Sequence, residues 1–330
     1  MKKGCMSKIF GTAISMLVVG TMVVGCGSTS KETTQTEAQN IESYKVGVFQ
    51  YIQHSALDQA NKGFIKALDE SGISYSVDQQ NASGDPSTTQ TIAQKMVNDE
   101  NDLIFAIATP AAQATAALTK EIPIVITAVT DPKDAGLVES NESPNGNVTG
   151  TSDLNPIDKQ ITLLKELIPD AKKVGILYCS SESNSKLQAE QARATCEANG
   201  LEATDFTVAN SNEIQTVVES MVGKVDVIYA PTDNVISNAM ATVSMIATEN
   251  KLPIIAGEEN QVTAGALATY SVDYEKLGYK AGKMAIEILK GEKEVGDIPI
   301  GYLEDDEYKL AVNEEVAKEL GIEGNIDEIN

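Results

Sequence analysis

The sequence has no tryptophan, a single histidine, His54, and four cysteines among 330 residues. Transition-metal sites need clusters of His, Cys and carboxylate ligands, and general base catalysis most often uses His. The motifs G-x-S-x-G and H-E-x-x-H and the phosphate-binding P-loop are absent as well. We therefore expect a protein that is not an enzyme, binds no metal and carries no cofactor.

Basic residues are scarce relative to acidic ones. The chain has 25 Lys and Arg against 48 Asp and Glu, a formal net charge of −23. Proteins that bind nucleic acids or anionic membrane surfaces need a basic face to neutralise phosphates. The charge balance excludes nucleic acid as a partner.

A long apolar run occupies the N-terminus, from Ile9 to Val24. Three lysines, Lys2, Lys3 and Lys8, precede it. Its length is typical of the hydrophobic part of an export signal and is short for a membrane span. The run ends in Val23-Val24-Gly25-Cys26, which resembles the bacterial lipobox. The resemblance implies a lipoprotein signal peptide over 1–25 and a lipid on Cys26. A simple secretory signal is the alternative.

The segment from Gly27 to Asn40 is rich in Ser, Thr, Glu and Gln and has no apolar periodicity. Such composition favours a flexible tether. Residues 26–43 are thus expected to hold the protein at the cell membrane by a lipid, outside the cytoplasm. Cys179 and Cys196 are expected to be free thiols, because the helix between them spans roughly 18 Å, beyond disulfide reach.

Short apolar runs alternate with amphipathic segments through the rest of the chain, and the pattern restarts halfway. The first half has strand patterns at 45–49, 74–78, 102–108 and 122–128, and the second half repeats them at 173–178, 225–230 and 252–256. Such βαβ alternation predicts parallel sheets. We expect an α/β protein with two Rossmann-like lobes joined by a hinge. One lobe should comprise 44–149 plus about 271–295, and the other 150–270 plus about 296–330.

The stretch from Asp102 to Gln113 joins a buried strand to an Ala-rich helix. We expect Thr109 as the helix N-cap and Pro110 at the first helical position. A helix N-terminus at the carboxyl end of a parallel strand suits a small anion, here a carboxylate because no phosphate loop follows. The alternative is an ordinary strand-to-helix corner.

Polar and aromatic residues follow the carboxyl ends of the predicted strands, where ligands bind in open α/β sheets. The set combines helix amides for a carboxylate, acids for an ammonium group and aromatics for an apolar side chain, which suits a zwitterion. The predicted ligand-binding residues are Tyr51, Gln53, His54, Thr109, Ala111, Ala112, Thr130, Asp131, Ser183, Asn184, Thr232, Asp233, Asn234, Glu258 and Tyr270.

Several of these residues have a purely structural alternative. His54 could hydrogen-bond a loop, and Asp131 before Pro132 is a common turn pair. The Thr232-Asp233-Asn234 segment could serve merely as the N-cap of the helix that it precedes, with no role in ligand binding. Glu258 could simply be solvated.

With these motifs in view, the chain resembles a family. The stretches 107–113, 128–132 and 231–234 are similar to those of substrate-binding lipoproteins of ABC importers, a family with tryptophan- and tyrosine-binding members. The resemblance runs from about Tyr44 to Gly321. One departure is Ser55, where relatives commonly have Pro.

The resemblance implies a type I periplasmic-binding-protein fold that closes on a small ligand and delivers it to an ABC permease with its ATPase. The ligand expected first is an aromatic amino acid, Trp, Tyr or Phe. Alternatives are a branched amino acid or a nucleoside, or a surface sensor or adhesin with the same fold.

Overall fold

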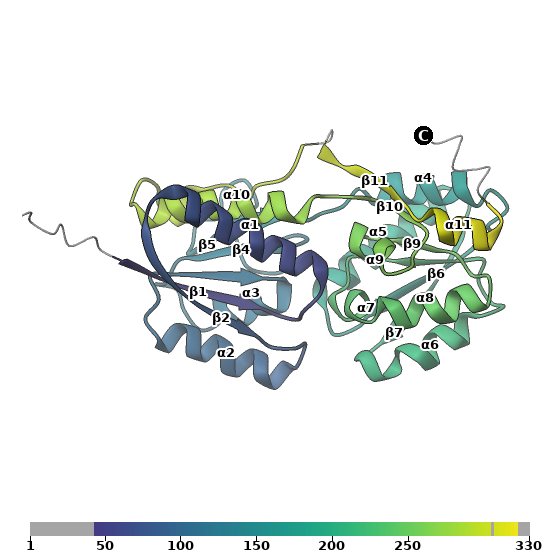
Figure 1. Ribbon diagram of the computed structural model, residues 1–330, viewed down its shortest axis with the longest axis horizontal. Helices are drawn as coiled ribbons and strands as arrows, with labels where there is room; N and C mark the ends of the chain where they lie inside the picture. Colours follow the sequence, from purple (N-terminus) through teal and green to yellow (C-terminus); the bar gives the residue numbers. More distant parts are fainter. Residues whose placement is uncertain (1–42, 305–306, 323–330) are drawn as a thin grey trace, which may run out of the picture. The chain divides into compact units, whose positions relative to one another are not determined.

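The computed structural model describes residues 43–304 and 307–322. The predicted signal peptide, the lipidation of Cys26 and nearly all of the tether therefore lie outside the described residues. Within the described ranges, two sheets with helices on both faces form the fold (Figure 1). This arrangement confirms the predicted α/β class.

The first sheet has five parallel strands in the order β2-β1-β3-β4-β5. Its strands are β1 (Ser43–Gln50), β2 (Ser74–Asn81), β3 (Leu103–Ile107), β4 (Ile124–Val129) and β5 (Val148–Ser152). Helices α1 (Ser55–Ser71) and α10 (Tyr274–Leu289) cover one face, and α2 (Pro86–Asn98) and α3 (Thr109–Ala116) the other (Figure 1). We call this sheet with these helices the first lobe. All five residues of β3 are buried, as expected for a parallel strand packed on both faces.

The second sheet has six strands in the order β11-β10-β9-β8-β6-β7. They are β6 (Lys173–Cys179), β7 (Glu202–Val208), β8 (Val227–Ala230), β9 (Ile254–Ala256), β10 (Ala268–Ser271) and β11 (Lys309–Val312). Five run parallel, and β11 pairs antiparallel with β10 at one edge. The strand β11 is not among the predicted elements, because an edge strand of one exposed and three half-buried residues has no distinct apolar run.

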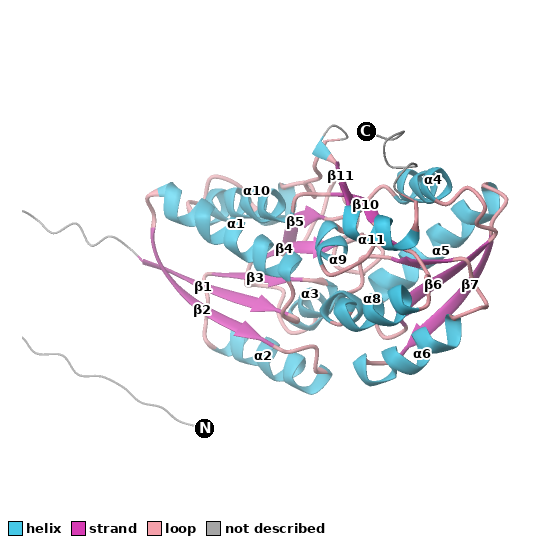
Figure 2. Cartoon of the chain, turned by 45° about the vertical axis from the view of Figure 1, so that its right-hand side comes forward, coloured by secondary structure: helices cyan, strands magenta, loops and turns pink. Residues whose placement is uncertain are grey.

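Helices flank the second sheet too (Figure 2). They are α4 (Ile157–Leu167), α5 (Ser183–Ala198), α6 (Ile214–Met221), α7 (Asn234–Asn238), α8 (Met240–Glu249), α9 (Glu259–Thr263) and α11 (Glu314–Leu320). Alternate residues of β6 enter different cores: Ile176 packs with α4 and α5, and Leu177 with α6 and α8. We call this sheet with these helices the second lobe.

Three segments connect the two lobes. Residues 153–156 lead from β5 to α4, residues 272–273 from β10 to α10, and residues 302–308 toward β11, with 305 and 306 outside the described ranges. The third connection begins after Gly301, which pairs with Thr151 beside the first sheet. It ends at Lys309, where the chain joins the second sheet as β11.

The returning helix α10 packs very closely on α1. A Cβ atom on Gly278 would lie 1.8 Å from the carbonyl oxygen of Ala60, and one on Gly63 would lie 2.0 Å from that of Glu275. Only glycine allows the two backbones to approach so closely. The contact fixes the start of α10, where Tyr274 enters the space between the lobes.

The predicted free thiols are confirmed: Cys179 and Cys196 are both unbridged and buried. The prediction that Thr109 caps α3 is wrong. The helix begins at Thr109 itself, the preceding residue is Ala108, and no side chain caps this end. Ala108 has a φ of 80°, a strained value for a residue other than glycine, which turns the chain from β3 directly into the helix.

Candidate functional site

A small cavity lies where residues of both lobes and the connecting segments meet. Its volume is about 10 Å³, room for about one water molecule. The first lobe contributes His54, Leu57, Ala128 and Tyr274, a connecting segment contributes Asp153, and the second lobe contributes Asn184, Thr232, Asp233, Asn234, Ser237 and Glu258. An amino acid is larger than this space, so binding one here requires the lobes to separate and close again.

Six of the predicted site residues line this cavity: His54, Asn184, Thr232, Asp233, Asn234 and Glu258. They come from four segments that are distant in sequence, and the carboxyl edges of the two sheets bring them together. Ala128, at the end of β4, also lines the cavity and has a φ of 54°. Such backbone strain in a residue other than glycine is often found at binding sites.

The other nine predicted residues lie outside the cavity lining. They are Tyr51, Gln53, Thr109, Ala111, Ala112, Thr130, Asp131, Ser183 and Tyr270. Asp131 Oδ1 accepts hydrogen bonds from the backbone N–H of Lys133 at 3.0 Å and from Asn141 Nδ2 at 3.0 Å, so its carboxylate closes its own turn. Tyr51 donates its hydroxyl to the carbonyl of Gly84 at 3.2 Å.

Several of these nine nevertheless lie at the contact between the lobes. Gln188 Nε2 donates to Thr130 Oγ1 at 3.0 Å, Asn238 Nδ2 donates to the carbonyl of Gln53 at 2.7 Å, and Gln113 Nε2 reaches Ser183 Oγ at 3.4 Å. These bonds join first-lobe residues to second-lobe residues, so the lobes touch around the cavity.

Four carboxyl groups are buried at or beside the cavity: Asp153, Glu182, Asp233 and Glu258, each at most 4% exposed. Burial raises the pKa of Asp153 to about 6, of Glu258 to about 7 and of Glu182 to about 8, and raises that of Asp233 as well. None of the ion pairs formed within the described ranges includes any of these four groups. A cation entering this site would stabilise the charged forms of these buried carboxyls.

Three of the four carboxyls are occupied by hydrogen bonds within the second lobe. Asp233 caps α7 through the N–H of Ile236 at 2.8 Å and also accepts from the N–H of Cys179 at 2.6 Å. Glu182 accepts from the N–H of Asn234 and of Val235 at the same helix start. Glu258 caps α9 through Asn260 N at 2.7 Å and accepts from Ser237 Oγ at 3.3 Å. The capping alternative for Asp233 is therefore what the geometry shows.

Asp153 differs from the other three and is a residue that the sequence prediction missed. Its Oδ2 accepts from the hydroxyl of Tyr274 at 2.9 Å, and its Oδ1 has no hydrogen-bond partner within the described part of the chain. The signal was present in the sequence, since Asp153 directly follows β5 in the way the other predicted residues follow their strands. Tyr274, also missed, is a buried residue on the first turn of α10.

His54 is neutral in this environment. Burial lowers the pKa of His54 to about 4, against smaller opposing effects of Asn234 and Asp58. Its Nε2 lies 3.3 Å from Asn234 Oδ1 across the lobe contact.

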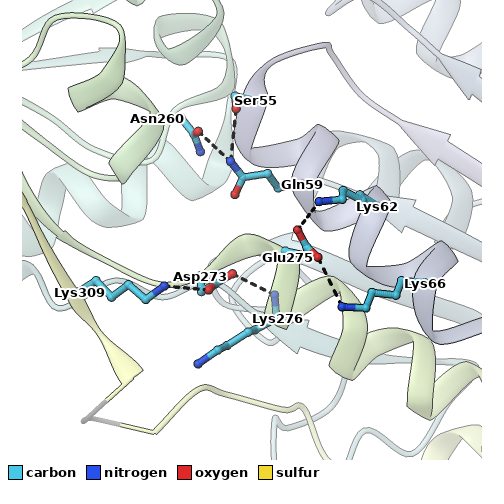
Figure 3. A network of polar contacts seen from close by, with 9 residues as sticks. All are labelled: Ser55, Gln59, Lys62, Lys66, Asn260, Asp273, Glu275, Lys276 and Lys309. Atoms are coloured by element: carbon cyan, nitrogen blue, oxygen red, sulfur yellow. Dashed lines mark hydrogen bonds and ion pairs between the residues drawn. The ribbon is translucent and has the colours of Figure 1, made fainter. Parts of the chain in front are cut away.

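A much larger groove of about 940 Å³ lies on the surface beside the connecting segments. Figure 3 shows its charged side chains, with Glu275 between Lys62 at 2.7 Å and Lys66 at 3.8 Å, and Lys309 Nζ 3.0 Å from Asp273. These exposed charges are already paired with one another and solvated, which leaves little energy for a ligand. The small cavity with its buried acids is the better candidate site.

The described residues contain no group of three or more His, Cys, Asp or Glu arranged to hold a metal ion. None of the helices in the described ranges has the length and apolar character that a membrane crossing requires.

Comparisons with known proteins agree with this fold. Residues 45–328 match the family model of ABC transporter substrate-binding proteins. The chain is 47% identical over 323 residues to a protein of Clostridioides difficile named tyrosine-binding protein, covering 96% of this chain and 93% of that one.

Two solved structures are informative. A structure from Streptococcus pneumoniae in complex with L-Trp is 39% identical, with a TM-score of 0.83 over 87% of this chain and 98% of that one. The ligand-free, open structure of a substrate-binding protein with adhesive properties from Clostridium difficile is 47% identical, with a TM-score of 0.65 over 84% and 95%. These matches confirm the predicted type I periplasmic-binding-protein fold. The chain belongs to the family of ABC transporter substrate-binding proteins, which bind solutes and are not enzymes.

Proposed function

We propose that this protein captures an aromatic amino acid, Trp, Tyr or Phe, in the cavity between its lobes and delivers it to an ABC permease and its ATPase. The observation that carries the proposal is the group of four buried carboxyls with no basic partner in an ion pair among the described residues. The ammonium group of an amino acid would supply the missing positive charge.

The relatives support the same ligand class. One of them is named a tyrosine-binding protein, and another was solved with L-Trp. In addition, the described arrangement is more similar to the L-Trp complex than to the open, ligand-free structure, although the latter is the more identical in sequence. This supports a hinge motion in which the lobes close on the ligand.

The start of α3 is the proposed place for the ligand carboxylate. The Thr109 hydroxyl is buried there with no hydrogen-bond partner in the described ranges, and α3 lies against Ser183, next to the cavity residue Asn184. First-turn amides, including those of Ala111 and Ala112, suit an anion. The fifteen predicted site residues remain part of this proposal.

The proposal also includes the place of action. Cys26 would carry the lipid, and residues 26–43 would tether the binding domain outside the cytoplasm. Adhesion is a second candidate function, because the relative with the open structure is described as having adhesive properties. Loss of cell attachment on deletion of the gene, with amino-acid uptake unchanged, would favour adhesion.

Thermal-shift measurements on the full-length protein, purified in detergent, would test binding. The panel should contain all twenty amino acids and several nucleosides. A ligand at a hundredfold its dissociation constant adds about 2.7 kcal/mol to the stability. Stabilisation by Trp, Tyr or Phe is the expected result, and a response only to nucleosides or only to branched amino acids would refute the proposed ligand.

A further inference from the structure

Three buried hydrogen-bond acceptors line the small cavity, and none of them has a partner among the described residues. They are Asp153 Oδ1, Asn184 Oδ1 and His54 Nδ1. Buried polar atoms are almost always hydrogen-bonded, so three in one cavity call for a common explanation. We infer that Asp153, Asn184 and His54 together bind the primary ammonium group of the ligand. This inference rests on the proposed function and names the part of the ligand that these residues recognise.

The acceptor character of Asp153 follows from its position. The residue lies in the segment that connects β5 to α4 and is 4% exposed. The residue lines the cavity, and the Tyr274 hydroxyl donates to Oδ2, which leaves Oδ1 as the oxygen without a partner among the described residues. The Thr130 hydroxyl also favours the charged form of this carboxyl, yet Oδ1 is without a hydrogen bond to any described residue.

The orientation of the Asn184 amide is fixed by its donors. Its Nδ2 donates to the carbonyl of Thr232 at 3.1 Å and to Ser185 Oγ at 3.3 Å. The oxygen Oδ1 must therefore be the atom left without a partner, and an amide oxygen can only accept.

The tautomer of His54 follows from a chain of hydrogen bonds. Asn234 Nδ2 donates to the Glu182 carboxyl group, which also accepts from two backbone N–H groups. Asn234 Oδ1 consequently faces His54 Nε2, so Nε2 must carry the proton. In the neutral ring, Nδ1 is then an acceptor.

Three acceptors, one of them a carboxylate, select the ligand group. A primary ammonium has three N–H donors and a positive charge, whereas a water molecule has two donors and a hydroxyl has one. A carboxylate or phosphate would face three acceptors and be repelled. The chemistry therefore matches an ammonium group and excludes an anion at this position.

The three acceptors also come from different parts of the fold. His54 belongs to the first lobe, Asn184 to the second, and Asp153 to a segment that connects them. An ammonium group bound to all three links the lobes directly. Amino-acid binding and lobe closure are coupled in this way, because the three contacts exist together only when the lobes meet.

The test compares ligands with and without the amine, by isothermal titration calorimetry on the full-length protein in detergent. The probes are L-tyrosine and 3-(4-hydroxyphenyl)propionate, with L-tryptophan and indole-3-propionate as the second pair. The variants are Asp153→Asn and Asn184→Ser. Asp226→Asn is the matched control, because its carboxylate accepts from the N–H groups of Lys172 and Lys173 at the start of β6, away from the cavity.

We expect Asp153→Asn to weaken binding of the amino acid by about 10- to 100-fold, the usual loss for a hydrogen bond to a charged group. Binding of the analogue without the amine should change little, and Asp226→Asn should bind both probes as the wild type does. If Asp153→Asn fails to fold, Asn184→Ser provides the same comparison.

Two results would overturn the inference while the proposed function stands. One is unchanged amino-acid affinity in both variants, and the other is an equal loss for the amino acid and for its analogue. A wild-type protein that binds no amino acid would instead refute the proposed function, so the two failures are distinguishable.

Discussion

Replacing Asp153 by Asn should make the ligand-free protein more stable at neutral pH, although it removes a proposed binding group. The carboxylate at this position is buried, and no described residue forms an ion pair with it. Burial raises its pKa from 3.8 to about 6, a difference of about 2 units. At about 1.4 kcal/mol per unit, the charged side chain costs about 3 kcal/mol when the pH is well above 6.

The sign of the pH dependence follows from this raised pKa. Between pH 4 and pH 6 the folded protein holds a proton on Asp153 that the unfolded chain has released. The destabilisation is therefore fully present above about pH 6 and is lost as the pH falls toward 4. Asp153→Asn should gain up to about 3 kcal/mol over the wild type at about pH 8 and only about 1 kcal/mol at about pH 4.5. Opening of the lobes would rehydrate the carboxylate, which makes this gain an upper value.

Urea denaturation of the two proteins at both pH values measures the difference directly. Asp226→Asn is a control of opposite sign, because hydrogen bonds from Lys172 and Lys173 lower the pKa of Asp226. Both folded and unfolded states keep Asp226 charged between about pH 8 and pH 5, so this variant should lose a constant amount. A wild type that is more stable than Asp153→Asn at pH 8, or a gain that is equal at both pH values, would refute the reasoning.

Three further predictions concern packing, capping and the ligand. Gly278→Ala should lower the free energy of unfolding by about 1–3 kcal/mol, because the added Cβ clashes with Ala60. Its control, Gly146→Ala, should be close to neutral in the same urea denaturation assay, because the nearest atom to its added Cβ is 3.9 Å away. Asp233→Ala should cost about 1–3 kcal/mol because it leaves the N–H groups of Ile236 and Cys179 buried without their acceptor; a thermal midpoint equal to that of the wild type would contradict this role. Affinity for L-tyrosine, measured by calorimetry, should fall as the pH is lowered through about 6, because protonation of Asp153 removes the charge that attracts the ammonium group. Constant affinity down to about pH 5 would argue against that attraction.

The order of strands and helices was predictable because it depends on local patterns. Buried parallel strands such as β3 are continuous apolar runs, and the repeated alternation with amphipathic helices restricts the topology to two similar lobes. The strand-end rule also predicted six of the cavity residues, since parallel strands place their carboxyl ends at one edge of a sheet. The free thiols followed from helix length in the same way.

Local patterns do not show which polar atoms are already used. Asp131, Asp153 and Asp233 all follow strands, yet Asp131 closes its own turn and Asp233 holds two backbone N–H groups. Asp153 alone of these keeps a buried oxygen without a partner among the described residues. Its partner Tyr274 is far along the chain and reaches it because α10 returns to the first lobe and packs on α1. The sequence by itself determined the fold class and the edge where a ligand would bind. The tertiary structure decided which groups at that edge remain available, because hydrogen-bond partners are set by contacts between distant segments.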